Sequence, residues 1–204
     1  MRRFDLLVIS ALVGASSLSW GATPASFSSE DVFELEYANN PQISPDGERI
    51  VYERRSNDIM IDATRSNLWL LDVASGAHRP LVSGLDNASS PQWSADGTRI
   101  AWLQGTAQGT GIYVHWLASG QTALLTTLRE SPSMLSWSPD GRWLAFVMPV
   151  RKETAALAKP PKKPEGAVWS EPVKTIDSIT FRRDGQGFIE PAYEHVYLLP
   201  ADGG

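Results

Sequence analysis

A threefold internal repeat constrains the fold of this sequence more than any other feature. Residues 41–52 (PQISPDGERIVY), 91–102 (PQWSADGTRIAW) and 134–146 (MLSWSPDGRWLAF) superpose. Their turn aspartates, Asp46, Asp96 and Asp140, recur every ~44 to 50 residues, a spacing typical of four-stranded β-propeller blades. Each copy is predicted to form a strand, a tight turn and a second strand.

The Ser-Pro/Ala-Asp-Gly core of the repeat has a physical explanation in turn chemistry. Proline presets φ at the second turn position, aspartate can accept bonds from the nearby backbone, and glycine accepts positive φ. Asp46, Asp96 and Asp140 are therefore predicted to be structural, with no catalytic role.

A second hairpin follows each turn, in residues 68–76, 112–120 and 196–204. A returning strand then follows in the first two copies, at residues 80–82 and 123–125. Four short strands per unit predict an all-β fold, a partial β-propeller of four-stranded blades. We expect blade units at about 41–84, 91–128 and 132–204. The third copy reaches its turn at Gly204 before a fourth strand, so the sequence predicts an incomplete propeller.

The third unit contains one long insertion, at about residues 150–194. Residues 151–166 are basic, rich in proline and lysine, and without apolar periodicity, which predicts a solvated loop. Residues 169–183 alternate at Ile176, Ile179 and Phe181, a pattern that favours an inserted strand.

The segment ahead of the first blade carries helix-start signals. Ser28 is the predicted N-cap, Asp31 stands three residues later as in a capping box, and Phe27 and Val32 occupy the positions of a hydrophobic staple. We therefore expect a short helix in residues 27–40 that leads into the propeller and covers its open edge.

The N-terminus indicates export. Arg2 and Arg3 precede an uncharged, largely apolar stretch at residues 6–18, which has the length of a signal-peptide core and is too short to span a bilayer. Residues 1–22 are predicted to be a signal peptide, with cleavage between Gly21 and Ala25. The mature protein is then expected in the bacterial periplasm or medium, with no membrane attachment.

Composition excludes several function classes. A net charge of -5 and a pI near 5.2 lack the basic footprint of nucleic-acid binders, so no nucleic-acid partner is expected. Without cysteine the chain has no disulfide, thiolate metal site or cysteine nucleophile. No phosphate loop, EF-hand or metal-ligand spacing is present in the sequence, so we assign no cofactor and no metal.

The aromatic and histidine residues also favour structural roles. Four tryptophans of the repeat strands, Trp93, Trp102, Trp137 and Trp143, are predicted to pack between blades, although a sugar- or peptide-stacking groove is the alternative. The three histidines are predicted to be strand-surface or loop residues. They are His78, His115 and His195.

Four segments stand in a characteristic order along the chain, residues 27–33 (FSSEDVF), 40–47 (NPQISPDG), 169–187 and 196–204. In this order they resemble the propeller of the prolyl oligopeptidase family of serine peptidases, closest to its acylaminoacyl-peptidase-like branch. TolB-like periplasmic propellers share the Ser-Pro-Asp-Gly repeats, so the position of the insertion and its Arg-Asp-Gly-Gln-Gly run carry the resemblance to the peptidases.

This resemblance implies hydrolysis of short peptides by a Ser-Asp-His triad on a C-terminal α/β-hydrolase domain, with the propeller limiting access. No triad residue can be placed in this chain, which has no G-x-S-x-G segment, so no catalytic residue is assigned. The sequence therefore predicts a substrate-gating propeller fragment, truncated before its hydrolase domain. The alternative is a TolB-like, non-enzymatic periplasmic propeller that binds a protein partner.

Overall fold

The computed structural model describes residues 26–151, 161–170, 176, 179–184 and 187–203. Strands dominate these residues, and the one helix among them is the 3-10 helix η1 (Glu30–Glu34). The first sheet holds β1 (Glu36–Ile43), β2 (Arg49–Asp58), β3 (Ala63–Asp72) and β4 (His78–Val82). The second holds β5 (Ala88–Trp93), β6 (Arg99–Thr106), β7 (Gly109–Trp116) and β8 (Gln121–Leu128). The third holds β9 (Ser133–Trp137), β10 (Trp143–Arg151) and β13 (Ala192–Pro200).

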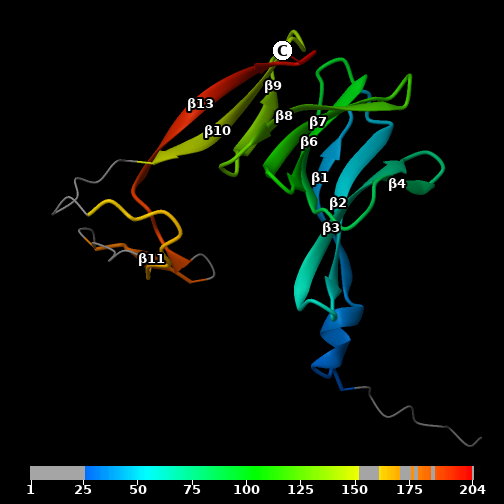
Figure 1. Ribbon diagram of the computed structural model, residues 1–204. Helices are drawn as coiled ribbons and strands as arrows, with labels where there is room; N and C mark the ends of the chain where they lie inside the picture. The colour runs from blue at the N-terminus through cyan, green and yellow to red at the C-terminus, as the bar shows by residue number, and fades with distance from the viewer. Residues whose placement is uncertain (1–25, 152–160, 171–175, 177–178, 185–186, 204) are drawn as a thin grey trace, which may run out of the picture.

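These three antiparallel sheets follow one another like blades (Figure 1). The strand orders are β1-β2-β3-β4 in blade 1, β5-β6-β7-β8 in blade 2 and β13-β10-β9 in blade 3. The first strands of neighbouring blades contact each other, β1 with β5 and β5 with β9, so the blades converge at these strands. The prediction of an all-β partial propeller with four-stranded blades is confirmed.

The repeated turns have the predicted geometry. In each of them the serine hydroxyl donates to the aspartate carboxylate, at 2.5 Å in Ser44–Asp46 and 2.6 Å in Ser94–Asp96 and Ser138–Asp140. The same carboxylate accepts the backbone N–H two residues later. The turn glycines have φ of 66° to 75°, a region that side chains with a Cβ rarely adopt.

Two apolar cores lie between the blades. The core between blades 1 and 2 contains Val51, Leu68 and Leu70 of blade 1 against Ile100 and Trp102 of blade 2. The core between blades 2 and 3 is built on the same plan. Its buried members are Ala101, Leu103, Ile112, Val114, Leu135, Leu144 and Phe146.

Aligned aromatic residues stack across the central hairpin of blades 2 and 3. Trp102 pairs with Tyr113 and Phe146 with Tyr197, in each case with ring centroids 5.6 Å apart and nearly parallel planes. Tyr113 and Tyr197 therefore occupy equivalent positions in blades 2 and 3. Three of the four repeat tryptophans pack between blades as expected, whereas Trp143 is 40% exposed. Trp143 occupies the position of Arg49 and Arg99, at the side of blade 3 that no blade of the described chain covers.

The N-terminal segment differs from the expected helix. η1 is a single 3-10 turn, and residues 36–40 belong to β1 because they pair with β2 from Glu36↔Ser56 onward. Ser29, not Ser28, is the N-cap and makes no side-chain cap bond. One half of the predicted capping box does form, since the Asp31 carboxylate accepts the Ser28 N–H at 2.6 Å. Pairing with β2 therefore overrides the local helix signals.

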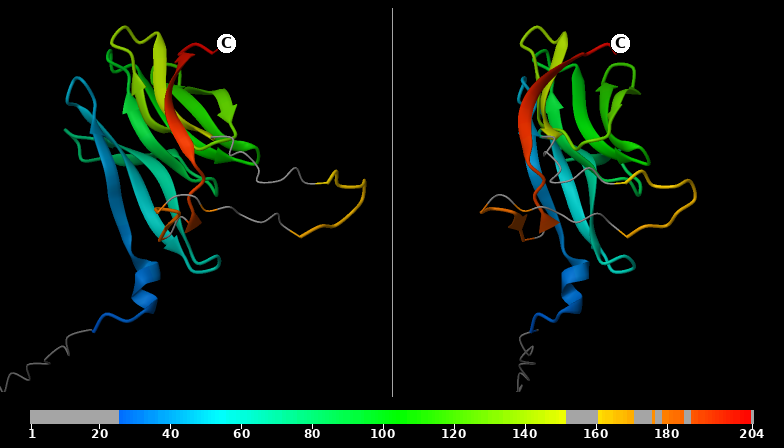
Figure 2. Two further views of the ribbon diagram at one scale, coloured as in Figure 1. Left: turned by 90° about the vertical axis from the view of Figure 1, so that its left-hand side faces the viewer. Right: turned by 60° about the vertical axis from the view of Figure 1, so that its left-hand side comes forward.

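The insertion lies between β10 and β13, which pair without interruption from Trp143↔Pro200 to Arg151↔Ala192. Its described residues 161–170 project away from the three blades (Figure 2). Ile176, Ile179 and Phe181, on which a strand was predicted, are not in a strand, and residues 171–175 and 177–178 of the predicted range lie outside the described residues. A two-residue hairpin follows instead, β11 (Arg182–Arg183) with β12 (Gly187–Phe188).

The predicted signal peptide, residues 1–22, lies outside the described residues. In the part of the chain that is described, no helix has both the length and the apolarity to cross a lipid bilayer.

Candidate functional site

The first strands of the blades form the edge where the blades converge, and each of them carries a β-bulge. The register slips between Asn39 and Gln42 in β1 and between Ser89 and Gln92 in β5, and β9 is irregular in the same way against β10. Bulges often mark functional edges of sheets because they redirect side chains. We call β1, β5 and β9 the inner strands.

Each bulge contains a residue other than glycine in the left-handed region. These residues are Asn40 with φ 48°, Ser90 with φ 55° and Met134 with φ 53°. Such a conformation costs free energy for a residue with a Cβ and is retained only where the surroundings enforce it. Its recurrence at three equivalent positions makes the inner strands the candidate functional surface of the chain.

A buried carboxylate anchors this surface. Glu53 in β2 is 2% exposed and accepts hydrogen bonds from the Asn39 amide at 2.9 Å, the Asn40 amide at 3.1 Å and the Ser90 N–H at 2.9 Å. Arg55 adds a charged contact at 2.7 Å. Glu53 therefore connects β1 and β2 of blade 1 with β5 of blade 2, and it holds two of the three bulges.

The pKa of Glu53 reflects opposing effects. Burial raises the pKa, but the hydrogen bonds from Asn39, Ser90, Arg55 and Asn40 together hold it below the ordinary value of 4.5. Glu53 is thus an ionised, fully bonded acceptor at neutral pH, which suits an architectural role and does not suit a general acid.

Neither Glu53 nor the bulges were identified from the sequence. One usable signal is a carboxylate, Glu53, directly after the apolar run Ile50-Val51-Tyr52. A second is the recurrence of a small polar pair before proline, Asn39-Asn40 before Pro41 and Ser89-Ser90 before Pro91. These polar pairs contact the Glu53 carboxylate only because of the register of β1, β2 and β5. That register cannot be predicted from composition or spacing.

The carboxylates of the turn aspartates accept hydrogen bonds from within their own turns. The Ser94 hydroxyl and the Thr98 N–H hold the pKa of Asp96 at about 2, and the equivalent bonds lower the pKa of Asp46 and of Asp140. These bonds support the structural role predicted for all three.

The histidines lie on different strands. His78 in β4 contacts the Tyr52 hydroxyl at 3.1 Å, and His115 in β7 contacts the Thr122 hydroxyl at 2.9 Å. Burial, followed by the nearby Arg79 charge, lowers the pKa of His115. His195 in β13 pairs with Met148 and is exposed. Each histidine is on a strand, where the sequence had predicted a strand-surface or loop position.

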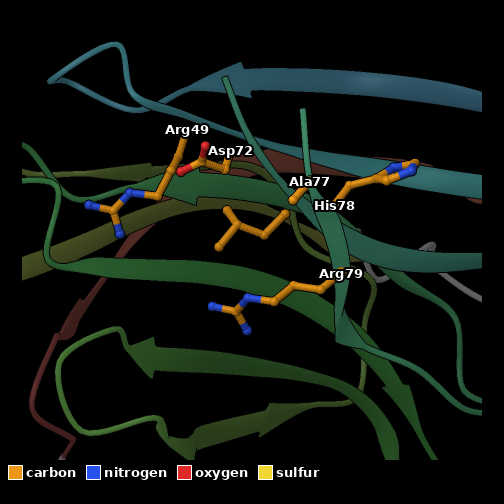
Figure 3. A pocket seen from close by; sticks show the side chains of 6 residues that line it. Arg49, Asp72, Ala77, His78 and Arg79 are labelled. Carbon is orange, nitrogen blue, oxygen red and sulfur yellow. The ribbon is translucent and has the colours of Figure 1, made fainter. Parts of the chain in front are cut away.

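A small cavity lies beside the blade 1–blade 2 junction (Figure 3). Its volume is about 190 Å³, and it is lined by Leu70, Asp72, Ala77 and three basic side chains, Arg49, His78 and Arg79. Figure 3 shows the Arg49 and Arg79 side chains extending away from His78. Ligand pockets usually measure about 300–1,000 Å³, so the cavity is below that range and we assign it no ligand.

Across the described ranges, no group of three or more His, Asp or Glu side chains is arranged to hold a metal ion.

Relatives of this chain occur among both peptidases and TolB proteins, although no protein-family model matches it. The uncharacterized peptidase YuxL of Bacillus subtilis is 25% identical over 176 residues, which cover 86% of this chain and 26% of YuxL. The Tol-Pal system protein TolB of Alcanivorax borkumensis is 38% identical over 88 residues, which cover 43% of this chain and 20% of TolB.

The propeller architecture also recurs in solved structures. Pyrococcus horikoshii acylaminoacyl peptidase superposes with a TM-score of 0.62 at 16% identity, over 83% of this chain and 24% of the peptidase. This superposition establishes the fold. The chain spans about a quarter of the length of YuxL and of the solved peptidase. The chain thus has the fold of a portion of the acylaminoacyl peptidase β-propeller, and its sequence is similar to part of the peptidase YuxL.

Proposed function

We propose that this chain is the substrate-admitting propeller segment of an exported serine peptidase that acts on short peptides. The observation that carries the proposal is the match to YuxL over 86% of this chain. In this proposal the catalytic triad belongs to an α/β-hydrolase domain, which is the partner of the chain, and the chain itself supplies no catalytic residue.

The inner strands are the part of the chain that we assign to substrate admission. They converge at the blade edges, carry the three bulges, and present amide and hydroxyl side chains at Gln42, Ser89, Gln92 and Ser133. Such side chains can donate to and accept from a peptide backbone without selecting one sequence. That chemistry suits a passage for varied short peptides.

Two measurements test this proposal. The coding sequence that follows codon 204 should encode a G-x-S-x-G segment and, after it, an aspartate and a histidine. In the longer polypeptide, Ser133→Trp on the exposed start of β9 should slow cleavage of peptides while leaving cleavage of a small chromogenic ester unchanged. Ser119→Trp, in the exposed turn between β7 and β8, is the matched control. Equal slowing of peptide and ester by Ser133→Trp would contradict the admission role.

A TolB-like binding module is the second candidate function. It is favoured by the 38% identity to Alcanivorax borkumensis TolB, which is higher than the 25% identity to YuxL. The TolB match covers 43% of this chain, whereas the YuxL match covers 86%. Additional blades followed by a stop codon, with no hydrolase segment, would support this candidate against the first.

A further inference from the structure

The two blade junctions differ in one polar contact at the level of the bulges. At the junction of blades 1 and 2, the Glu53 carboxylate accepts the Ser90 N–H of the next blade at 2.9 Å. Leu103 takes the position of Glu53 in the register of blade 2, and Met134 is the bulge residue that it faces in blade 3. A carboxylate therefore holds the bulge at the first junction, whereas an aliphatic side chain stands there at the second.

Met134 has a left-handed backbone without the bonds that hold the other two bulges. In blade 1 the Asn40 amide donates to Glu53 at 3.1 Å, and in blade 2 the Ser90 N–H donates to the same carboxylate. Leu103 carries no acceptor, so its side chain offers the Met134 N–H nothing equivalent. Left-handed backbone costs free energy for a residue with a Cβ, and strain that the surrounding bonds do not explain is typical of ligand-binding sites.

The Met134 side chain is accessible at the edge where the inner strands converge. It is 75% exposed although β5 of blade 2 lies beside its strand. Ser90, which occupies the same position with a described blade on either side, is also only half-buried. A neighbouring blade on both sides thus does not bury this position, so the position faces the inner-strand surface.

Two polar side chains of β5 accompany Met134. Ser89 and Gln92 pair with buried residues of the core between blades 2 and 3, so their side chains point toward blade 3. Within the part of the chain that the structure describes, neither side chain makes a hydrogen bond. The equivalent amides of blade 1, at Asn39 and Gln42, are both bonded to other side chains. Polar groups free to bind a ligand are therefore found at the second junction and not at the first.

We propose that Ser89, Gln92 and Met134 form a subsite for one apolar side chain of an extended short peptide, which we call the methionine subsite. This inference rests on the proposed function, in which short peptides pass along the inner strands. The apolar side chain packs on the Met134 thioether. Peptide carbonyls accept from the Met134 N–H and the Gln92 amide, and a peptide N–H donates to the Ser89 hydroxyl. Because methionine is flexible and polarizable, the methionine subsite accepts apolar side chains of different shapes.

NMR of the methionine methyl groups tests the methionine subsite on the unaltered chain. A blocked Ala-Leu-Ala-Ala tetrapeptide should shift the Met134 methyl signal in a saturable way. Met60, which is 86% exposed between β2 and β3, is the matched control, and its signal should not move. The signal of Met148, which packs on the core between blades 2 and 3, reports that the chain is folded. A blocked Ala-Asn-Ala-Ala peptide of similar size should bind at least about fivefold more weakly, because asparagine gains nothing from apolar contact.

Two variants separate the apolar contact from the polar ones, with calorimetry as the measurement. Met134→Ser should weaken binding of the leucine peptide at least about fivefold and leave binding of the asparagine peptide unchanged. Ser89→Ala should weaken binding of both peptides about threefold, because it removes a bond to the peptide backbone. Met60→Ser should change neither affinity.

A Met134 signal that moves no more than that of Met60 would overturn the methionine subsite. So would a Met134→Ser variant that binds the leucine peptide as tightly as the wild type. Binding is measured without cleavage, so these results are distinct from failure of the proposed function. If the longer polypeptide cleaves no peptide while the leucine peptide still binds at Met134, the proposed function fails and the methionine subsite stands as a peptide-binding site.

Discussion

The Trp93 indole N–H donates to the Gln42 carbonyl at 2.9 Å and joins two blades across 51 positions of sequence. Trp137 makes the same bond to the Gln92 carbonyl at 3.1 Å, so the contact repeats at the next junction. In both cases an arginine of the preceding blade covers the indole ring. The junctions therefore combine a directional bond with apolar packing, which fixes the rotation of one blade against the next.

Replacement of the junction tryptophans should weaken the array measurably. Trp93→Phe and Trp137→Phe retain an aromatic ring but leave a carbonyl without its donor, so each should lower the free energy of unfolding by about 1–2 kcal/mol. Urea denaturation followed by circular dichroism is the measurement. Trp169→Phe, in the insertion, is the control and should change the free energy by less than about 0.5 kcal/mol. Equal effects at all three positions would contradict the role of the interblade bond.

Among the polar side chains, Glu53 should be the one whose substitution lowers the free energy of unfolding most. Glu53→Gln places an amide among the donors of Asn39, Asn40 and Ser90, and should cost about 2–4 kcal/mol of unfolding free energy. The control is Glu48→Gln, which changes an exposed carboxylate of the first repeat turn. A Glu53→Gln variant as stable as the wild type would show that these bonds contribute nothing net.

Glu53 should also contribute to acid sensitivity. Its pKa in the folded state is below the ordinary 4.5, so its stabilising contribution is complete above about pH 4.5 and is lost as the pH falls through the folded value. The wild-type chain should therefore lose stability more steeply below pH 4.5 than Glu53→Gln does. Thermal melts between pH 3 and pH 7 measure this, and parallel curves would contradict it.

The pKa of Asp96 should depend on one hydroxyl. The Ser94 side chain, which is fully buried, donates to this carboxylate at 2.6 Å and is the largest cause of its pKa of about 2. Ser94→Ala should raise the pKa of Asp96 toward its ordinary 3.8, as measured by carboxyl carbon NMR titration. Ser119→Ala, remote from this turn, should leave the titration unchanged. An unaltered Asp96 pKa in Ser94→Ala would contradict the assignment.

The chain alone is expected to lack hydrolase activity. A fluorophosphonate probe, which labels activated serines, should not label the purified 204-residue chain stoichiometrically, because the proposed triad belongs to another domain. A serine hydrolase in the same buffer is the positive control. Stoichiometric labelling of a single serine would reveal a nucleophile that we have not assigned.

Export should be visible at the N-terminus of the protein. Expression in a bacterium should give a mature chain that begins between Ala22 and Ser26, as determined by mass analysis of the exported fraction. Replacing Leu7 and Leu12 with lysine should prevent processing. Recovery of an intact Met1 terminus in the soluble cytoplasmic fraction of the unaltered chain would contradict the signal peptide.

Features that depend on local chemistry were predictable from the sequence. The Ser94–Asp96 turn and its two copies are specified by adjacent residues, and the period-2 pattern with the repeat locates the central strands of each blade. The 3-10 turn at η1 departs from prediction because residues 36–40 gain backbone bonds in β1 that a helix would forgo. Local signals were outweighed there by long-range pairing.

Features that depend on position within the array were not predictable. Trp143 matches the other repeat tryptophans in residue type, but register places it where Arg49 and Arg99 stand, so it remains exposed. The candidate site could not be predicted from the sequence for the same reason. Glu53 meets Ser90 at a separation of 37 positions, and no local pattern reports that contact.

The position of the insertion has a consequence for the order in which the blades can form on the ribosome. The central hairpins of blades 1 and 2 close over short turns, whereas β10 can pair with β13 only after about 40 further residues have been synthesised. The longer loop makes closure of this hairpin about 2 kcal/mol less favourable in entropy than closure over a short turn. At ordinary elongation rates that wait lasts about 2–8 s. During this interval Phe146 has no Tyr197 to stack on, and β10 is an apolar strand without its outer partner. Blade 3 is therefore the unit whose central hairpin forms last and whose apolar strand stays unpaired the longest during synthesis.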